Sequence, residues 1–232
     1  ETGYTERLMN AVQKELRLDR QPRHIECFDN SNLQGAHPVA SCVVFRDGKP
    51  SRKEYRHFNI KTVTGADDYA SMREVVFRRY TRLMAEGAEM PDLIIADGGK
   101  GQMGVIHEVL ERLGLDIPIA GLAKDDRHRT AELLCGFPPV LVGIRPTSPL
   151  FHFLAHIQEE VHRFAVSFHR QKRSKAFIHS ELEQIEGVGD KTVQTLLRHF
   201  RTVEKVRAAN IEELSALVGA AKAKKIRAFF EK

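Results

Sequence analysis

Two aspartates, Asp29 and Asp97, each follow an apolar run that is typical of a buried strand. The runs are IECF in the stretch IECFDNSNLQG and LIIA in the stretch PDLIIADGGKGQ. If the two strands are neighbours in a sheet, the carboxylates lie roughly 5 Å apart, and they repel unless a cation lies between them. Oxygen ligands suit Mg²⁺ or Mn²⁺, so both aspartates are predicted metal ligands. The alternative is that each one ends a strand and caps the next turn.

Two further residues could join this chemistry. Asp68 opens an arginine-bearing helix, where it could serve as an N-cap or first-turn acid, or lean over the same sheet edge. His162 lies one residue off the apolar stripe of a long helix; a lone flanking histidine is usually structural, but beside the aspartates it could bind a second cation or move a proton. His152 and His156 have the spacing of a helix-borne metal pair, but no HExxH is present, so we favour a packing or surface role.

The segment ADGGKGQ places two glycines and a lysine directly after Asp97. It lacks the spacing and the Ser or Thr of a P-loop, which weakens a nucleotide triphosphatase interpretation. Gly98 and Gly99 would let the backbone turn sharply, and Lys100 could then reach a phosphate.

Glycine turns near the C-terminus predict a second kind of phosphate contact. In IEGVGDK, Gly187 and Gly189 would expose backbone N–H groups at the start of a helix, where the dipole also favours an anion. Lys191 adds positive charge, and the downstream segment LVGAAKAKK contributes Gly219 and Lys222. Such hairpins hold a DNA backbone without reading bases.

The apolar patterns along the chain predict the elements that position these residues. In order, they indicate a helix over 5–18, β-rich runs over 23–29, 37–49 and 53–61, a helix over 68–86, a strand before Asp97, a helix to about 113, a strand over 117–124, a hairpin over 127–144 and a long helix over 148–172. Three antiparallel strands are thus followed by parallel strands with crossover helices. This is the order of a ribonuclease H-like α/β sheet, in which the first and fourth strands are parallel neighbours.

The chain changes character near residue 175. Residues 161–180 contain five Lys or Arg and no Asp or Glu, which indicates a helix end and a basic linker. Two copies of a helix, a glycine turn and a basic amphipathic helix follow, and such copies bury their apolar faces by pairing. We therefore predict a ribonuclease H-like domain over 1–175 and a small all-α tandem helix-hairpin-helix domain over 176–232.

Composition narrows the class of partner and compartment. The chain has 232 residues, 42% of them hydrophobic, which is enough for one core and a second, smaller one. Its formal net charge of +5 favours a polyanionic partner. Cys27, Cys42 and Cys135 form neither a disulfide framework nor a zinc knuckle; the first two are expected in the core, and a reducing cytoplasm fits. No membrane-spanning run or signal-peptide core is present, and no small-molecule ligand is expected. The first residue is not Met, which suggests a fragment.

The motifs FDNSN, DDYASMREVVFRRY, IIADGGKGQ and EEVHRFA, with the paired hairpins after IEGVG, closely resemble the C-terminal half of the UvrC family, the incision subunit of bacterial nucleotide excision repair. The resemblance covers nearly the whole chain. It implies an endonuclease that cuts the damaged strand on the 5′ side of a lesion. It also implies that Asp29, Asp97 and His162 form the catalytic triad, with Asp68 as an additional acidic residue.

Two positions depart from the family pattern. Many relatives read FDISH where this chain has FDNSN, so the family histidine is replaced by Asn32, and Ala221 stands where a stricter hairpin has glycine. In the full-length family, a second nuclease segment and the segment that docks UvrB lie N-terminal to this region. The implied partners are therefore damaged, bubble or junction DNA, and the UvrB–DNA complex for the full-length protein.

Three interpretations follow. The first is metal-dependent phosphodiester hydrolysis, in which bound cations activate water and stabilise phosphate charge. The second is a non-catalytic, structure-selective DNA-binding module that keeps an inherited fold. The third is another ribonuclease H-like nuclease that acts on hybrids or recombination intermediates. The set of Asp29, Asp97 and His162 favours an enzyme over a pure binder, and the paired hairpins disfavour the third interpretation.

Overall fold

A computed structural model describes residues 2–31, 39–63, 67–124 and 130–231. The chain divides into two compact units, Glu1–Phe168 and His169–Lys232. The first unit holds the sheet, and the second is helical.

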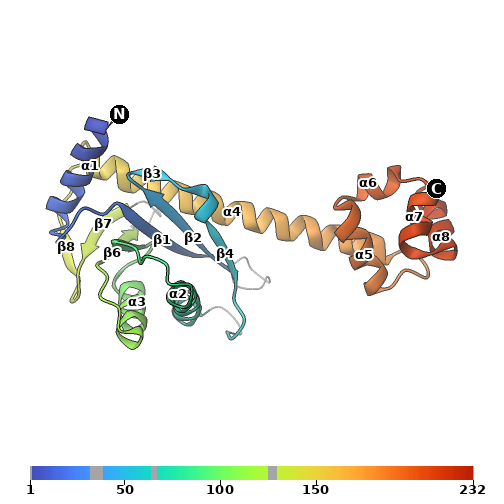
Figure 1. The fold of residues 1–232 in the computed structure, drawn as a ribbon, viewed down its shortest axis with the longest axis horizontal. Coiled ribbons are helices and arrows are strands. Elements are labelled where there is room, and N and C mark those ends of the chain that lie inside the picture. Colours follow the sequence, from blue (N-terminus) through green and yellow to red (C-terminus); the bar gives the residue numbers. More distant parts are fainter. Residues whose placement is uncertain (1, 32–38, 64–66, 125–129, 232) are drawn as a thin grey trace. The chain divides into compact units, whose positions relative to one another are not determined.

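The first unit is built on one mixed sheet (Figure 1). Its strands are β1 (His24–Ser31), β2 (Val39–Arg46), β3 (Lys49–Pro50), β4 (Arg56–Asn59), β5 (Leu93–Ala96), β6 (Ile119–Lys124), β7 (Thr130–Cys135) and β8 (Val140–Val142). They lie in the order β3-β2-β1-β5-β6-β7-β8, and β4 also pairs with β2. The neighbours β1, β5 and β6 are parallel, and the remaining pairings are antiparallel. This confirms the predicted mixed sheet with its first and fourth predicted strands side by side.

Helices cover both faces of the sheet. The helix α1 (Thr2–Glu15) and the first part of α4 (Pro149–Glu183) pack on one face, and α2 (Asp68–Ala85) and α3 (Lys100–Leu113) pack on the other (Figure 1). Successive side chains of a strand point to opposite faces, so Ile25 and Cys27 of β1 lie in the α1/α4 core and Phe28 lies in the α2/α3 core. Cys27 and Cys42 are buried free thiols, as predicted.

A buried ionic cluster fixes α2 on β1. The Glu26 carboxylate accepts hydrogen bonds from Arg79 at 2.9 and 2.8 Å and from the Tyr80 hydroxyl at 2.9 Å, and the His24 ring lies 2.8 Å away. Burial alone raises the pKa of Glu26, but the hydrogen bonds from His24 and Arg79 outweigh it and lower the pKa to about 2. The cluster sets the position of α2, and with it that of Asp68.

Three predicted elements differ from the structure. The predicted third strand over 53–61 is shorter: β4 covers only Arg56–Asn59. A 3₁₀ turn, η1 (Arg52–Glu54), precedes it, because Glu54 accepts hydrogen bonds from Ser51 at 2.7 Å and from Arg46 at 2.7 and 2.8 Å, and β3 lies before the predicted range. The predicted hairpin joins the main sheet, since β7 pairs with β6. The long helix does not end near 172, and residues 161–180 are helix rather than linker, because no Gly or Pro occurs between residues 150 and 186.

The second unit contains the end of α4 and four further helices, α5 (Asp190–Phe200), α6 (Val203–Ala208), α7 (Ile211–Val218) and α8 (Ala220–Phe230). They share a small core of their own. Glycine turns join α4 to α5 and α7 to α8, which confirms the predicted tandem helix-hairpin-helix; α6, between the two copies, was not predicted. None of the helices described, in either unit, is long and apolar enough to cross a membrane.

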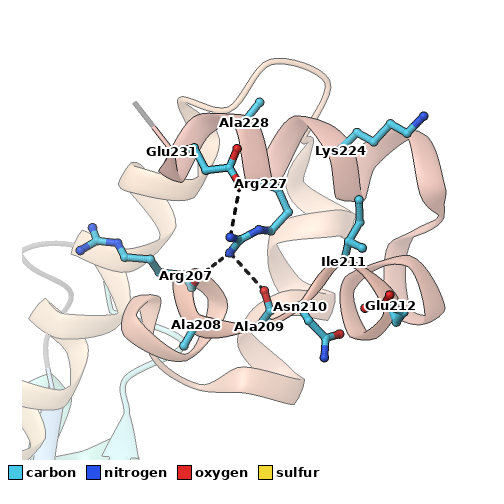
Figure 2. A pocket seen from close by; sticks show the side chains of 10 residues that line it. All are labelled: Arg207, Ala208, Ala209, Asn210, Ile211, Glu212, Lys224, Arg227, Ala228 and Glu231. Carbon is cyan, nitrogen blue, oxygen red and sulfur yellow. Dashed lines mark hydrogen bonds and ion pairs between the residues drawn. The ribbon is translucent and has the colours of Figure 1, made fainter.

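Arg227 holds the second hairpin copy together (Figure 2). Its guanidinium donates to the carbonyl oxygens of Arg207 at 2.7 Å and Ala209 at 3.2 Å and pairs with Glu231 at 3.3 Å. It thereby satisfies carbonyls at the end of α6 and ties α8 to the segment before α7. The surrounding hollow, of about 700 Å³, includes neither glycine turn, so we assign it a structural role.

Candidate active site

Three neighbouring parallel strands end at one edge of the sheet, and each carries a charged residue there. Asp29 lies near the end of β1, Asp97 directly follows β5, and Lys124 is the last residue of β6. The register pairs Phe28 with Ala96, and the Asp97 amide donates to the Phe28 carbonyl at 3.0 Å. Asp29 and Asp97 therefore come next to each other, as the sequence predicted.

Both oxygens of the Asp97 carboxylate have partners. The Lys124 ammonium lies 3.1 Å from Oδ2, and the Gln158 side-chain amide of α4 donates to Oδ1 at 3.0 Å. Because side chains alternate along β1 and β5, Asp29 and Asp97 belong to the face covered by α4. Sequence reasoning missed Lys124 and Gln158, although the strand-end argument applied to IPIAGLAK would have found Lys124.

The surroundings of Asp29 are different. Its carboxylate is 8% exposed and accepts no hydrogen bond from the described residues. Burial raises its pKa to about 7, the negative charge of Asp97 adds to the shift, Lys124 opposes it, and Asp68 makes a smaller contribution. This buried carboxylate thus lacks a close counter-charge within the described part of the chain.

These residues fit a divalent cation. Two carboxylates on adjacent strands repel each other, and a cation between them would supply the charge that Asp29 lacks. Within the described ranges, no three His, Cys, Asp or Glu side chains gather closely enough to hold a metal ion. Asp29 and Asp97 would therefore be its protein ligands, and the remaining positions suit water and a phosphate.

Asp68 is the first residue of α2, but it is not the N-cap. Asp67 holds that position, and its side chain accepts from the Ala70 amide at 3.0 Å, so the N-cap alternative for Asp68 is wrong. The Asn30 side chain donates to the Asp68 carbonyl at 2.7 Å, which ties this end of α2 to the end of β1. Asp68 therefore lies near the edge that carries Asp29.

His162 lies one turn beyond Gln158 on α4, so the two residues share a helix face. His162 is exposed, and no hydrogen bond or ion pair joins it to the described part of the chain. The two other histidines of interest lie elsewhere: His152 is exposed, and His156 packs edge-on against Phe45 with ring centroids 5.4 Å apart.

The helix N-termini fall into two groups. Side chains cap α2, α4, α6 and α7, namely those of Asp67, Ser148, Thr202 and Asn210. In contrast, α3, α5 and α8 begin at the glycines Gly99, Gly189 and Gly219, with no side-chain cap. The second group contains the three helices for which the sequence predicted phosphate contacts, and no cap side chain occupies their first amides.

Lysines accompany these glycine-capped ends. Lys100 and Lys191 are exposed in the first turns of α3 and α5. Lys222 of α8 donates to the Thr192 hydroxyl at 3.0 Å, so it contacts the helix of the first hairpin. Gly187 has a φ of +82°, and a Cβ there would lie 2.7 Å from the ammonium of Lys225, a cation that sequence reasoning missed. Two lysines of α8 therefore lie beside the first hairpin.

The fold and the strand-end carboxylates define a class of protein: a ribonuclease H-like domain joined to a tandem helix-hairpin-helix. The family described as the UvrC RNAse H endonuclease domain matches residues 13–166, and the SAM-like helix-hairpin-helix tandem matches residues 180–232. The chain belongs to the UvrC family.

Relatives are similar along nearly the whole chain. The UvrABC system protein C of Bacteroides fragilis is 60% identical over 221 residues, which are 95% of this chain and 36% of that protein. The same protein of Streptococcus uberis is 57% identical over 203 residues, or 87% of this chain and 34% of that one. The chain thus spans about a third of the length of these relatives. A Ciona intestinalis endonuclease V in complex with DNA is 14% identical, with a TM-score of 0.35 over 54% of this chain and 58% of that one.

Proposed function

We propose that this chain hydrolyses a phosphodiester bond of DNA on the 5′ side of a lesion in nucleotide excision repair. The observation that carries the proposal is the pair of strand-end carboxylates, in which Asp29 is buried without a hydrogen-bond donor from the described residues. A protein that only binds DNA has no need of such a pair, because the pair adds repulsion and no contact surface.

Asp29 and Asp97 would hold Mg²⁺ or Mn²⁺ at this edge. When bound, the ion would supply a polarised water and stabilise charge on the phosphate. Lys124 and Gln158 would orient the Asp97 carboxylate through their contacts with its two oxygens. His162 would bind a second cation or move a proton, and Asp68 would be an additional acidic residue of the site.

The glycine-capped helices would hold the DNA backbone. Lys100 would contact a phosphate near the cut, and the two hairpins, with Gly187, Gly189 and Lys191 in the first and Gly219 and Lys222 in the second, would contact phosphates of damaged, bubble or junction DNA. We place the boundary between the catalytic and hairpin domains near residue 175. The cytoplasm as the compartment, and a UvrB–DNA complex as partner of the full-length protein, are part of the same proposal.

The proposal is tested by incision of a lesion-containing duplex, with this chain in its full-length context and with Mg²⁺ or Mn²⁺ saturating. Asp29→Asn or Asp97→Asn should abolish the 5′ cut and leave DNA affinity within about twofold, since a single group that holds a catalytic metal accounts for several kcal/mol of transition-state stabilisation. The exposed Asp116→Asn is the matched control and should cut normally.

Near-normal cleavage by both site variants would leave the DNA-binding module as the better interpretation. A preference for RNA–DNA hybrids or recombination intermediates over damaged duplex would favour the other nuclease class. The two alternatives therefore give different results in the same assay.

A further inference from the structure

Two hollows follow the outer face of α2 and meet at Phe77 and Arg78. The first, of about 480 Å³, lies between α2, residues 61–63 and α3; the second, of about 530 Å³, lies between α2 and β4. The lining residues of α2 run from Ala70 to Ala85, and Glu86 follows the end of the helix. We call the continuous feature the α2 groove.

The α2 groove concentrates the positive charge of the first unit. Seven Lys or Arg residues and two Glu residues line it, a formal charge of +5. When Glu26 and Glu108, the partners of Arg79 and Arg73 outside the groove, are included, the formal charge is +3. Without the lining residues, residues 1–168 have a formal charge of −6, whereas residues 169–232 carry +6. The groove is therefore the first unit's main attraction for a polyanion.

Three of these cations have no carboxylate partner among the described residues. They are Arg56, Lys61 and Arg112, and the first of them donates only to the carbonyls of Lys53 and Tyr55. All three lie on the rim, and each is exposed. They can neutralise phosphates without breaking an ion pair of the fold.

An exposed aromatic ring lies at the centre of this charge. Phe77 is 43% exposed and lines both hollows. Next to it, Arg78 lies over the Phe58 ring at 5.5 Å and donates to the Asn59 carbonyl at 2.7 Å, which fixes its guanidinium. An exposed aromatic ring that lines a cationic hollow is a platform on which an unpaired base stacks, whereas a duplex keeps its base faces covered.

The α2 groove begins at the edge that carries the aspartates. Asn59, the last residue of β4, pairs with Val39, which pairs with Ser31 of β1, two residues beyond Asp29. The lining residues 61–63 follow Asn59 closely in the chain, and Ala70 is two residues beyond Asp68. Asp29 and Asp97 belong to the face covered by α4, and α2 covers the other face, so a strand that leaves the Asp29 edge could reach the groove by passing around the ends of the strands.

We propose that the α2 groove binds single-stranded DNA adjacent to the cut, with a base stacked on Phe77 and phosphates on Arg56, Lys61 and Arg112. The choice of DNA as the polyanion rests on the proposed function. The hairpins hold phosphates of any DNA form, so the groove is the part of the molecule that distinguishes unpaired from paired strands.

The test measures the affinity of the chain for a labelled oligothymidine and for a duplex of the same length, by fluorescence anisotropy in chelator, so that no cut occurs. Phe77→Ala should weaken oligothymidine binding about 5- to 100-fold, the range for removal of one stacking partner, and change duplex binding less than twofold. Tyr4→Ala is the matched control, because Tyr4 is a more exposed aromatic residue, at 63%, outside the groove.

The charge contribution is tested separately. For oligothymidine, log affinity falls as log salt rises. The double variant Lys61→Gln with Arg112→Gln should make this slope less steep by about 1.4, or about 0.7 for each phosphate that is no longer neutralised. The double variant Arg7→Gln with Lys14→Gln, which removes two exposed cations of α1, should leave the slope unchanged. Thermal unfolding of each variant shows that it is folded.

Unchanged oligothymidine binding by folded Phe77→Ala would overturn the proposal, as would equal losses in Tyr4→Ala. If Phe77→Ala weakened the binding of polyglutamate but not that of oligothymidine, the groove would be assigned to an acidic protein instead. Failure of this proposal and failure of the proposed function can be told apart. Unchanged oligothymidine binding by Phe77→Ala together with normal incision by the unsubstituted chain refutes the groove alone, and Phe77-dependent oligothymidine binding without incision refutes the nuclease alone.

Discussion

At the scale of single residues, the two aspartates of the edge have unequal surroundings. Asp97 is held by Lys124 and Gln158, whereas Asp29 is buried with no hydrogen-bond donor from the described ranges. In the proposed metal site, Asp97 would be oriented before a cation binds, and Asp29 would gain its partner when the cation binds. A buried carboxylate without a hydrogen-bond donor, such as that of Asp29, lowers the stability of the cation-free fold when it is charged.

The pH dependence of stability follows from the raised pKa of Asp29. The folded chain holds the Asp29 proton up to about pH 7, whereas the unfolded chain loses it near pH 4. The stabilisation of the folded chain by this proton is therefore full below about pH 4 and is lost as the pH rises to about 7. The loss amounts to about 4 kcal/mol. Asp29→Asn should therefore become more stable relative to the unsubstituted chain between about pH 4 and 8, measured by urea unfolding in chelator. Asp116→Asn, an exposed control, should show no such trend.

His162 should matter for incision more than its neighbours on α4. It shares a helix face with Gln158, which contacts Asp97, while His156 packs on Phe45 and His152 lies one turn earlier. We expect His162→Ala to lose most of the 5′ incision rate, and His152→Ala and His156→Ala to lose little. All three lie on one helix, so the comparison controls for helix damage. Equal loss in all three, or none in His162→Ala, would return His162 to a structural role.

At the scale of elements, the N-terminus of α5 has no side-chain cap, so a substitution there should change DNA binding and stability in different directions. Gly189 has an ordinary backbone conformation, with φ −96°, and a Cβ there meets no atom within 4 Å, so a serine fits. The serine hydroxyl would accept from the first-turn amides and compete with a phosphate. Gly189→Ser should raise stability by a few tenths of a kcal/mol or leave it unchanged, yet weaken DNA binding several-fold, measured by thermal unfolding and anisotropy. The control Thr202→Ser at α6 should change neither. Tighter binding by Gly189→Ser would remove this helix end from the interface.

The sequence predicted the elements that have local signals. Asp29 and Asp97 were found because each interrupts an apolar strand, and the parallel neighbours were found from the element order. Lys124 has the same strand-end position as the aspartates and could have been found in the same way. Gln158 carries no local signal, because a glutamine on an amphipathic helix is common, and only the packing of α4 on the sheet brings it to Asp97. Asp68 was predicted as an N-cap or first-turn acid; Asp67 is the N-cap, and Asp68 is the acidic residue of the first turn.

The misplaced boundaries have physical reasons of the same kind. A basic run was interpreted as the end of a helix, but charge alone does not end a helix that contains no Gly or Pro, so α4 continues to Glu183. The break between β3 and β4 depends on the Arg46–Glu54 pair, which joins residues of two different elements. Such contacts between elements form only when the chain folds, so the local sequence does not predict them.

At the scale of the whole molecule, the proposed function assigns the cut to the first unit and DNA holding to the second. Each has its own core, so removing residues 180–232 should leave the first unit folded. We expect this truncation to weaken binding to duplex and bubble DNA at least about tenfold and to flatten its salt dependence, because both hairpins and the phosphates they neutralise drop out of the complex. The measurement is anisotropy over a series of salt concentrations, with circular dichroism as the control for folding. Equal affinity of the truncated and intact chains would contradict the hairpin assignment.

If Asp29 and Asp97 hold a cation as we propose, the sheet edge exchanges protons for cations. Burial raises the pKa of Asp29 to about 7, so a metal ion would displace a proton when it binds near neutral pH. Cation affinity should accordingly fall as the solution is acidified below about pH 7, a range in which ordinary carboxylate sites are already fully ionised. A single proton would therefore close this edge to the ion in mild acid.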